Sequence, residues 1–297
     1  MPTKKPCHIA PLPFQGMKYN FAKRFKAAIQ EAAWERDRSG GNGITVVDVF
    51  GGSGLLSRTA KDALPSARVV CNERDGYAQR LAMIDETETL RQKLHEAEAE
   101  CADKQKRKYT KDGQDNIRRI VAEHAKQFGR VDYVTINRWV TFSSKSPLSD
   151  RLMRPEYSRV PINPLHVKEA KTWFDGIETI NADFRDAIQP FLNDPNAILV
   201  LDPPYPKTQQ QQYKSSGAKE FGREDFLDLF ELMRPPFFFF ASYKSGIPQF
   251  FKRVFDEQAK GHEKCSENGA FMREFTRVTS LDTMQVYDES MFMNAKG

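Results

Sequence analysis

Two short β-branched or apolar runs constrain the fold of this chain more than any other feature. Ile44–Val49 (ITVVDV) is followed by Phe50 and the cluster Gly-Gly-Ser-Gly, and Ala197–Leu201 (AILVL) is followed by Asp-Pro-Pro-Tyr. Runs of this length that are closed by glycine or proline are typical of central strands in a parallel sheet covered on both faces. We therefore predict an α/β fold whose ligands bind at the carboxyl ends of these two strands.

Further strands and helices alternate with these two runs. Arg68–Cys71 (RVVC) predicts a strand after a helix at Leu55–Leu64, which together make a β-α-β unit. Pro236–Ser242 (PFFFFAS) predicts another strand after the helical pattern of Phe226–Met233, and Tyr19–Glu35 predicts a helix near the start of the chain. This alternation indicates a doubly wound sheet.

The middle of the chain has a different composition. Ala78–Gln127 is charged and glycine-poor and predicts helices, whereas Asn137–Pro164 is an irregular stretch rich in proline, serine and arginine. A long irregular stretch inside a compact domain is usually functional or disordered. We therefore predict a sheet domain made of residues 1–77 and 174–297, with residues 78–173 as an insertion.

Composition excludes several classes of protein. Of the 297 residues 29% are charged, and no apolar run approaches the ~20 residues of a membrane-spanning helix. The first ten residues contain no apolar core of a secretory signal, so we expect a cytoplasmic protein. The four cysteines and five histidines show no spacing typical of a metal site, and we expect no metal. A net charge of +5 is compatible with a polyanionic partner.

The glycine-rich turn after the first strand favours a ligand without phosphates. Its spacing is not G-x-G-x-x-G, which makes a pyrophosphate cradle a poor fit. We expect Asp48 to face an ammonium group and the helix start at Leu55 to face an anion. Glu73 follows Gly51 by about 20 residues, where nucleotide-binding sheets place an acid on the ribose hydroxyls. The alternative is a plain tight turn followed by an exposed acid.

The turn Asp202-Pro203-Pro204-Tyr205 favours a planar ligand that carries an amino group. The two prolines remove two backbone donors, so the nearby carbonyls and the Asp202 carboxylate act as acceptors. Tyr205 offers a flat face for stacking. This combination suits the exocyclic amine of adenine, although a structural turn after a strand is the alternative.

Taken in order, these motifs carry a resemblance to a known family. The chain contains PFQGMKYNFAKRF, DVFGGSGLL, CNERD, NADFRD, LDPPY and SLDTMQVYD, and in this it resembles the Dam-like (alpha-group) DNA adenine-N6 methyltransferases. The resemblance implies a Rossmann-like methyltransferase sheet with a mainly helical target-recognition insertion, S-adenosylmethionine as cofactor, and a flipped adenine in duplex DNA as substrate. The compact size and the lack of a restriction-endonuclease motif favour a stand-alone or phage-type enzyme of a bacterial or phage-infected cytoplasm, with membership of a restriction-modification pair left open, and we expect a monomer or weak dimer.

The resemblance assigns residues to two roles. The catalytic residues would be Asp202, Pro203, Pro204 and Tyr205, and the cofactor-binding residues would be Gly16, Lys18, Asp48, Phe50, Gly51, Gly54, Glu73, Asp183, Phe184 and Asp202. Three of them have plainer alternatives: Lys18 as a solvated lysine, Asp183 as a helix N-cap, and Phe184 as a core residue. The chain departs from the family pattern at Met17, where a second glycine is usual, and it lacks an Asn-Gly-rich hairpin, so no target sequence is implied.

The irregular stretch is the candidate nucleic-acid reader. Basic residues alternate there with aromatic ones, and the expected DNA-binding residues are Arg138, Lys145, Arg151, Arg154 and Arg159. Arginines bind phosphates and guanine edges. The alternative is a basic surface loop, in which case Lys104–Lys111 is the next candidate.

Two rival functions fit the same residues. One is methylation of adenine N6 in RNA or of cytosine N4 in DNA, which the shared fold would also support. The other is a catalytically silent DNA-binding relative that has kept the fold. Comparing methyl incorporation into duplex DNA with that into total RNA distinguishes a DNA enzyme from an RNA enzyme. Cofactor binding without methyl transfer would indicate the silent relative.

Overall fold

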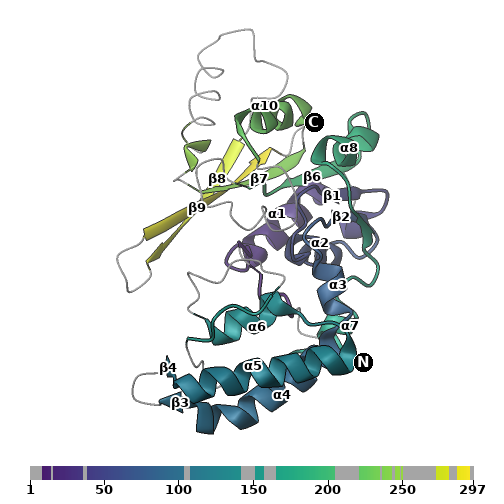
Figure 1. The fold of residues 1–297 in the computed structure, drawn as a ribbon. Coiled ribbons are helices and arrows are strands. Elements are labelled where there is room, and N and C mark those ends of the chain that lie inside the picture. Colours follow the sequence, from purple (N-terminus) through teal and green to yellow (C-terminus); the bar gives the residue numbers. More distant parts are fainter. Residues whose placement is uncertain are drawn as a thin grey trace.

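The computed structural model describes residues 9–14, 16–35, 39–103, 108–141, 151–156, 165–204, 221–234, 236–242, 245–247, 249, 272–280 and 286–294. Over these residues the central feature is a seven-stranded sheet (Figure 1). Its strands, in spatial order, are β5 (Glu178–Ile180), β2 (Arg68–Asn72), β1 (Thr45–Asp48), β6 (Ala197–Leu201), β7 (Phe237–Ser242), β9 (Val286–Asn294) and β8 (Met272–Ser280).

The direction of the strands defines where a ligand would bind. The five strands from β5 to β7 run parallel, and β9 runs antiparallel between β7 and β8. The chain builds outward from β1 in both directions, so the order reverses between β1 and β6. Ligands of open α/β sheets bind beyond the carboxyl ends of the strands at such a switch point. Here those ends are Asp48 and Leu201.

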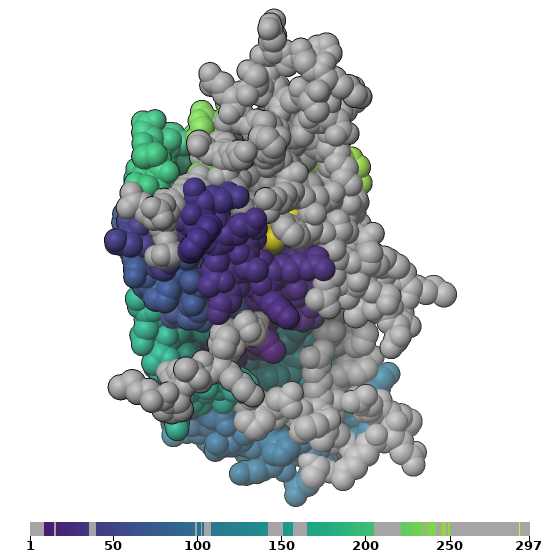
Figure 2. All heavy atoms as spheres, turned by 180° about the vertical axis from the view of Figure 1, so that it is seen from behind, coloured from purple at the N-terminus to yellow at the C-terminus, as the bar shows by residue number. Residues whose placement is uncertain are grey.

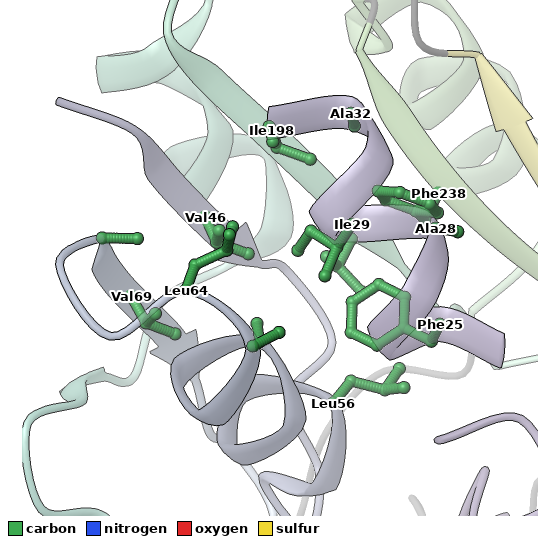
Figure 3. Packing of buried hydrophobic residues seen from close by; sticks show 14 of the residues in the cluster. Phe25, Ala28, Ile29, Ala32, Val46, Leu56, Leu64, Val69, Ile198 and Phe238 are labelled. Atoms are coloured by element: carbon green, nitrogen blue, oxygen red, sulfur yellow. The ribbon is translucent and has the colours of Figure 1, made fainter. Parts of the chain in front are cut away.

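Helices cover both faces of the sheet, as the buried runs predicted. On one face lie α1 (Ala22–Trp34) and α2 (Leu55–Ala63), and on the other α8 (Phe184–Ile188), the 3₁₀ turn η3 (Gln189–Phe191) and α10 (Arg223–Leu232). A 3₁₀ turn, η1 (Ser39–Gly41), leads into β1. Figure 3 shows the first face, where Phe25 and Ile29 of α1 pack toward Phe238 of β7.

The four consecutive phenylalanines of β7 follow from this double cover. Successive side chains of a strand point to opposite faces. Phe238 and Phe240 therefore pack under α1, whereas Phe237 and Phe239 pack under α8 and α10, and all four are almost completely buried. Burying a phenylalanine stabilises the fold by about 1.5–3 kcal/mol, so this strand alone makes a large contribution.

A group of helices follows β2 and encloses an apolar cluster of its own. It consists of α3 (Tyr77–Leu81), α4 (Ile84–Cys101), a short pair of strands β3 (Ala102–Asp103) and β4 (Lys108–Tyr109), α5 (Lys111–Phe128), α6 (Tyr133–Val140) and α7 (Val167–Lys171). Leu94, Ile117 and Trp139, from α4, α5 and α6, meet in that cluster. Seen from behind, the N-terminal residues (purple) lie above the helices of this insertion (blue) (Figure 2).

The strands and helices predicted around the sheet are confirmed, each to within a few residues. The prediction of an irregular stretch from residue 137 is wrong at its start, because Asn137–Val140 completes helix α6. The α6 sequence carries a helical apolar face, which the polar residues that follow it obscured. The proposed domain boundaries at 77/78 and 173/174 stay a prediction.

No helix within the described ranges combines the length and the apolar character that crossing a membrane requires.

Candidate active site

An ion pair between a buried lysine and a half-buried aspartate lies at the switch point of the sheet. Lys18 precedes α1, and its ammonium Nζ lies 3.0 Å from Oδ2 of Asp202, the residue that follows β6. The Lys18 side chain is only 4% exposed, and its Nζ also donates to the Gly16 carbonyl at 2.9 Å. The alternative of a solvated lysine is therefore wrong. The pair joins the N-terminal segment directly to the predicted catalytic acid.

Asp48 lies beside this pair and is more deeply buried, with 1% of its surface exposed. Its Oδ2 accepts hydrogen bonds from the Ser57 amide (3.1 Å) and hydroxyl (2.6 Å) in the first turn of α2. Its Oδ1 is buried and has no hydrogen-bond partner among the described residues. The anion at the start of α2 is thus this carboxylate of the protein itself.

Burial has a strong effect on the Asp48 carboxyl group. Burial, with a smaller contribution from the negative charge of Asp202, raises the pKa of Asp48 from 3.8 to about 7, and the hydrogen bonds from Ser57 oppose part of this shift. An isolated buried carboxylate is costly to ionise. A positively charged ligand group next to Oδ1 would remove much of that cost, so the site favours a cation.

The glycines of the turn after β1 make room mainly for the protein's own atoms. A Cβ on Gly51 would lie 2.3 Å from the Cys71 sulfur, and one on Gly54 would lie 2.5 Å from the Phe174 ring. Gly54 also has a φ of +69°, which favours glycine. The Trp173 indole donates to the Ser53 carbonyl at 2.8 Å and fixes the turn further. Binding of a ligand by Gly51 and Gly54 stays a prediction.

Two acids follow β2 rather than one. Glu73 is buried, and its Oε1 and Oε2 accept from the amides of Tyr77 (2.9 Å) and Ala78 (3.1 Å), so it caps α3. The alternative of an exposed acid is wrong. Asp75 is half-buried, and burial together with the charge of Glu73 raises its pKa to about 6, against the opposing charges of Arg74 and Arg80. Asp75 was not predicted as a site residue, although CNERD displays both acids.

Aromatic rings gather next to these acids, at the start of α8. Phe50 and Phe184 have ring centroids 5.7 Å apart, and Phe221 lies 5.8 Å and 5.7 Å from them. Phe184 is buried, which confirms its alternative as a core residue and leaves a contact with a ligand as a prediction. Phe221 was not anticipated, because it follows a segment with no recognisable pattern.

Asp183 is the N-cap of α8, as its alternative proposed. Its Oδ1 accepts from the Arg185 amide (3.1 Å) and guanidinium (3.0 Å), and Arg74 lies 3.5 Å from Oδ2. Asn72 holds this corner to the glycine-rich turn, because its amide group donates to both Val49 and Ala182 carbonyls at 3.0 Å. The carboxyl ends of β1, β2 and β5 are therefore connected.

The predicted catalytic tetrapeptide is described only in part. Asp202 and Pro204 are half-buried and Pro203 is buried directly after β6, whereas Tyr205 lies outside the described residues. The stacking role of Tyr205 therefore stays a prediction. Within the described ranges, no group of three or more His, Cys, Asp or Glu side chains is placed to hold a metal ion.

The structure brings three of the five predicted DNA-binding residues to one part of the insertion. Arg138 lies on α6, and the exposed Arg151 and Arg154 belong to the segment 151–156. Asn137 ties that segment to α6, since its side chain donates to the Arg151 carbonyl (3.0 Å) and accepts from the Met153 amide (2.8 Å). Lys145 and Arg159 lie outside the described residues.

The fold and this site define a class of protein. A parallel sheet that reverses between β1 and β6, with a glycine-rich turn and an acidic turn meeting at the reversal, is a Rossmann-like methyltransferase fold. A protein of Haemophilus influenzae named "Putative methyltransferase" is 36% identical over 294 residues, which cover 98% of this chain and 94% of that protein. The chain belongs to this methyltransferase family. No protein-family model matches it.

Proposed function

We propose that this methyltransferase transfers a methyl group from S-adenosylmethionine to N6 of a flipped-out adenine at specific sites in duplex DNA. The observation that carries the proposal is the ion pair between the buried Lys18 and the half-buried Asp202, which lies next to Asp48 at the switch point and is followed by two prolines. Asp48 supplies a carboxylate that favours a cation, and Asp202 with the proline turn supplies a rigid row of acceptors. These two features suit a methyl donor that is a cation and a methyl acceptor that is an amine.

The residues at the switch point fit the proposed cofactor. The buried Oδ1 of Asp48 has no hydrogen-bond partner among the described residues, so an ammonium group that reached it would meet an unpaired acceptor, and the acids Glu73 and Asp75 lie where nucleotide-binding sheets hold ribose hydroxyls. Phe50 and Phe184 offer ring surface at the neighbouring corner. When bound, the cofactor supplies a methyl group on a positively charged sulfur.

The protein's own contribution to the chemistry is to prepare the amine. The exocyclic nitrogen of adenine is a weak nucleophile because its lone pair delocalises into the ring. Asp202 and the Pro203 carbonyl would accept the two amine hydrogens and draw the nitrogen toward tetrahedral geometry, which frees the lone pair. Lys18 fixes the orientation of the Asp202 carboxylate through Oδ2. Acceptors that are already in place lower the barrier because they need no reorganisation.

The insertion would supply the contacts to DNA. Arg138, Arg151 and Arg154 lie on α6 and on the segment that Asn137 ties to it, so they form one unit of the structure. Guanidinium groups bind phosphates and the edge of guanine, and their number sets the salt dependence of binding. The recognised DNA sequence does not follow from these residues.

The test is to sequence DNA from cells that express the protein, with detection of N6-methyladenine in its sequence context. We expect methylated adenine in one short recurring sequence, and none in cells that express Asp202→Asn at an equal level. Purified protein should transfer labelled methyl to duplex DNA and not to total RNA. Methylation of RNA alone, or of cytosine, would refute the proposed substrate; binding of S-adenosylhomocysteine with no transfer to any nucleic acid would indicate a silent relative.

A further inference from the structure

A single buried arginine joins three separate parts of the molecule. Arg80, on α3, is 6% exposed. Its Nε donates to Oδ1 of Asp132 at 2.9 Å, and its Nη2 donates to the Pro13 carbonyl (2.9 Å) and the Thr135 hydroxyl (2.8 Å). The Asp132 side chain is fully buried and caps α6, accepting from the Thr135 amide at 3.0 Å. Arg80 therefore holds the N-terminal segment and α6 to α3.

The N-terminal segment leads from Arg80 to the candidate active site. We call residues 10–14 and 16–18 the N-terminal strap. The Tyr77 hydroxyl of α3 donates to the Leu12 carbonyl (3.0 Å) and accepts from the Leu12 amide (2.9 Å). The next ring, Phe14, lies against the glycine-rich turn, where a Cβ on Gly52 would come within 2.9 Å of it. The strap ends at Lys18, which pairs with Asp202.

Helix α3 is held at both of its ends. Glu73, a predicted cofactor residue, accepts from the amides of Tyr77 and Ala78 at its start, and Arg80 binds Asp132 in its last turn. In Figure 1, α3 lies between α2 and the other helices of the insertion. Beyond Asp132, α6 carries Arg138 and, through Asn137, the segment with Arg151. Helices α3 and α6, joined by the Arg80–Asp132 pair, thus link Glu73 at the edge of the sheet to the segment that carries Arg151.

We propose that Arg80 is a positioning residue that couples ligand binding at the glycine-rich turn to the ordering of α6. The inference rests on the proposed function only for the nature of the ligand. A ligand that orders Glu73 and the strap restricts α3, and the directional, charged bonds of the Arg80 guanidinium pass that restriction to Asp132. Apolar contacts between α3 and α6 would instead allow the two helices to slide against each other. The coupling would give this pair a role besides stability, to which buried ion pairs often contribute no more than apolar residues of equal size.

The test measures backbone amide hydrogen exchange with and without S-adenosylhomocysteine. In the wild-type protein we expect the ligand to slow exchange both in the glycine-rich turn and in α6, at least about fivefold in α6. The test variant is Arg80→Met with Asp132→Asn, which removes both charges together and keeps an N-cap oxygen for the Thr135 amide. In this variant the turn should still be protected by the ligand, while α6 should lose the protection.

Two further variants separate coupling from a loss of stability. Arg91→Met is the matched control, because Arg91 is also buried (7% exposed) and pairs with a carboxylate, Glu88, inside α4. In the Arg91→Met variant, S-adenosylhomocysteine should still slow amide hydrogen exchange in α6. Arg80→Lys keeps the charge but not the fork that reaches Pro13 and Asp132 together, and should also uncouple α6.

The remaining outcomes contradict either the coupling or the proposed cofactor. Protection of α6 that survives in the double variant, or that is absent from the wild-type protein while the turn is protected, overturns the coupling. A wild-type protein that shows no protection anywhere and no heat of binding with S-adenosylhomocysteine overturns the proposed cofactor, and with it the ligand on which the coupling depends.

Discussion

Asp48→Asn should make the protein more stable at alkaline pH, because it removes a carboxylate that the fold buries. Asparagine has the same shape, and its side-chain oxygen can still accept from the Ser57 amide and hydroxyl. The only large change is that residue 48 can no longer ionise. Any difference between the two proteins that varies with pH is therefore due to this group.

The size of the effect follows from the pKa of Asp48. It is about 7 in the folded protein against an ordinary value of 3.8, so the folded state binds the extra proton between these values. Stability from this group therefore falls as pH rises from about 4 to 7, and levels off above that range. Since each pKa unit corresponds to about 1.4 kcal/mol, the free energy of unfolding of the wild type should fall by roughly 2–3 kcal/mol relative to Asp48→Asn between pH 5 and pH 8.

The assay is guanidinium unfolding of both proteins at about one-unit pH steps across that range, without ligand. Asp112→Asn, an exposed residue of α5, controls for the removal of a surface carboxylate. A free-energy difference between wild type and Asp48→Asn that does not change with pH would refute the reasoning, and so would a wild type that gains stability relative to the variant as pH rises.

Three further predictions test the site. Asp202→Asn should lower methyl transfer about 10²–10³-fold while S-adenosylhomocysteine still binds by calorimetry, and a near wild-type rate would remove Asp202 from catalysis. Gly54→Ala and Gly16→Ala both place alanine at positive φ, which costs about 1–2 kcal/mol, but only at Gly54 does the new Cβ meet a ring. Chemical unfolding should show the larger loss at Gly54, and equal losses would contradict the packing argument. Arg151→Ala with Arg154→Ala should lower the salt slope of duplex binding by about one for each phosphate that is no longer neutralised, and an unchanged slope would exclude this segment.

Much of the sheet could be predicted from the sequence because its central strands are buried on both faces. Such strands read as continuous apolar runs, as Ala197–Leu201 and the phenylalanines of β7 do. The outer strands lack this signal. β5 is three residues long and partly exposed, and β8 and β9 mix polar and apolar residues, so no run marks them.

Only the candidate-site residues that belong to short sequence motifs could be predicted. The turn glycines, Glu73 and Asp202 stand in short patterns next to strands, and strand topology then places them at one edge of the sheet. Pairings between distant segments have no such pattern. Lys18 pairs with Asp202, and Arg80 with Asp132, only because folding brings the strap next to the end of β6 and α3 next to the start of α6. The positions of these residues at one edge of the sheet were therefore foreseeable one by one, whereas the connections between them were not; their contacts with a cofactor stay a prediction.

The charges at the switch point give the reason to expect a cationic ligand at this site. Lys18 balances one of the two carboxylates, Asp202, which leaves Asp48 as the group that either keeps a proton or receives a cation. Near neutral pH the proton and a ligand cation compete for the same oxygen. Binding of a cation should therefore release a proton and tighten as pH rises toward 8, which is the opposite of the effect that pH has on the stability of the ligand-free protein. The same buried carboxylate that lowers the stability of the ligand-free protein at higher pH would thus contribute affinity for a cationic ligand.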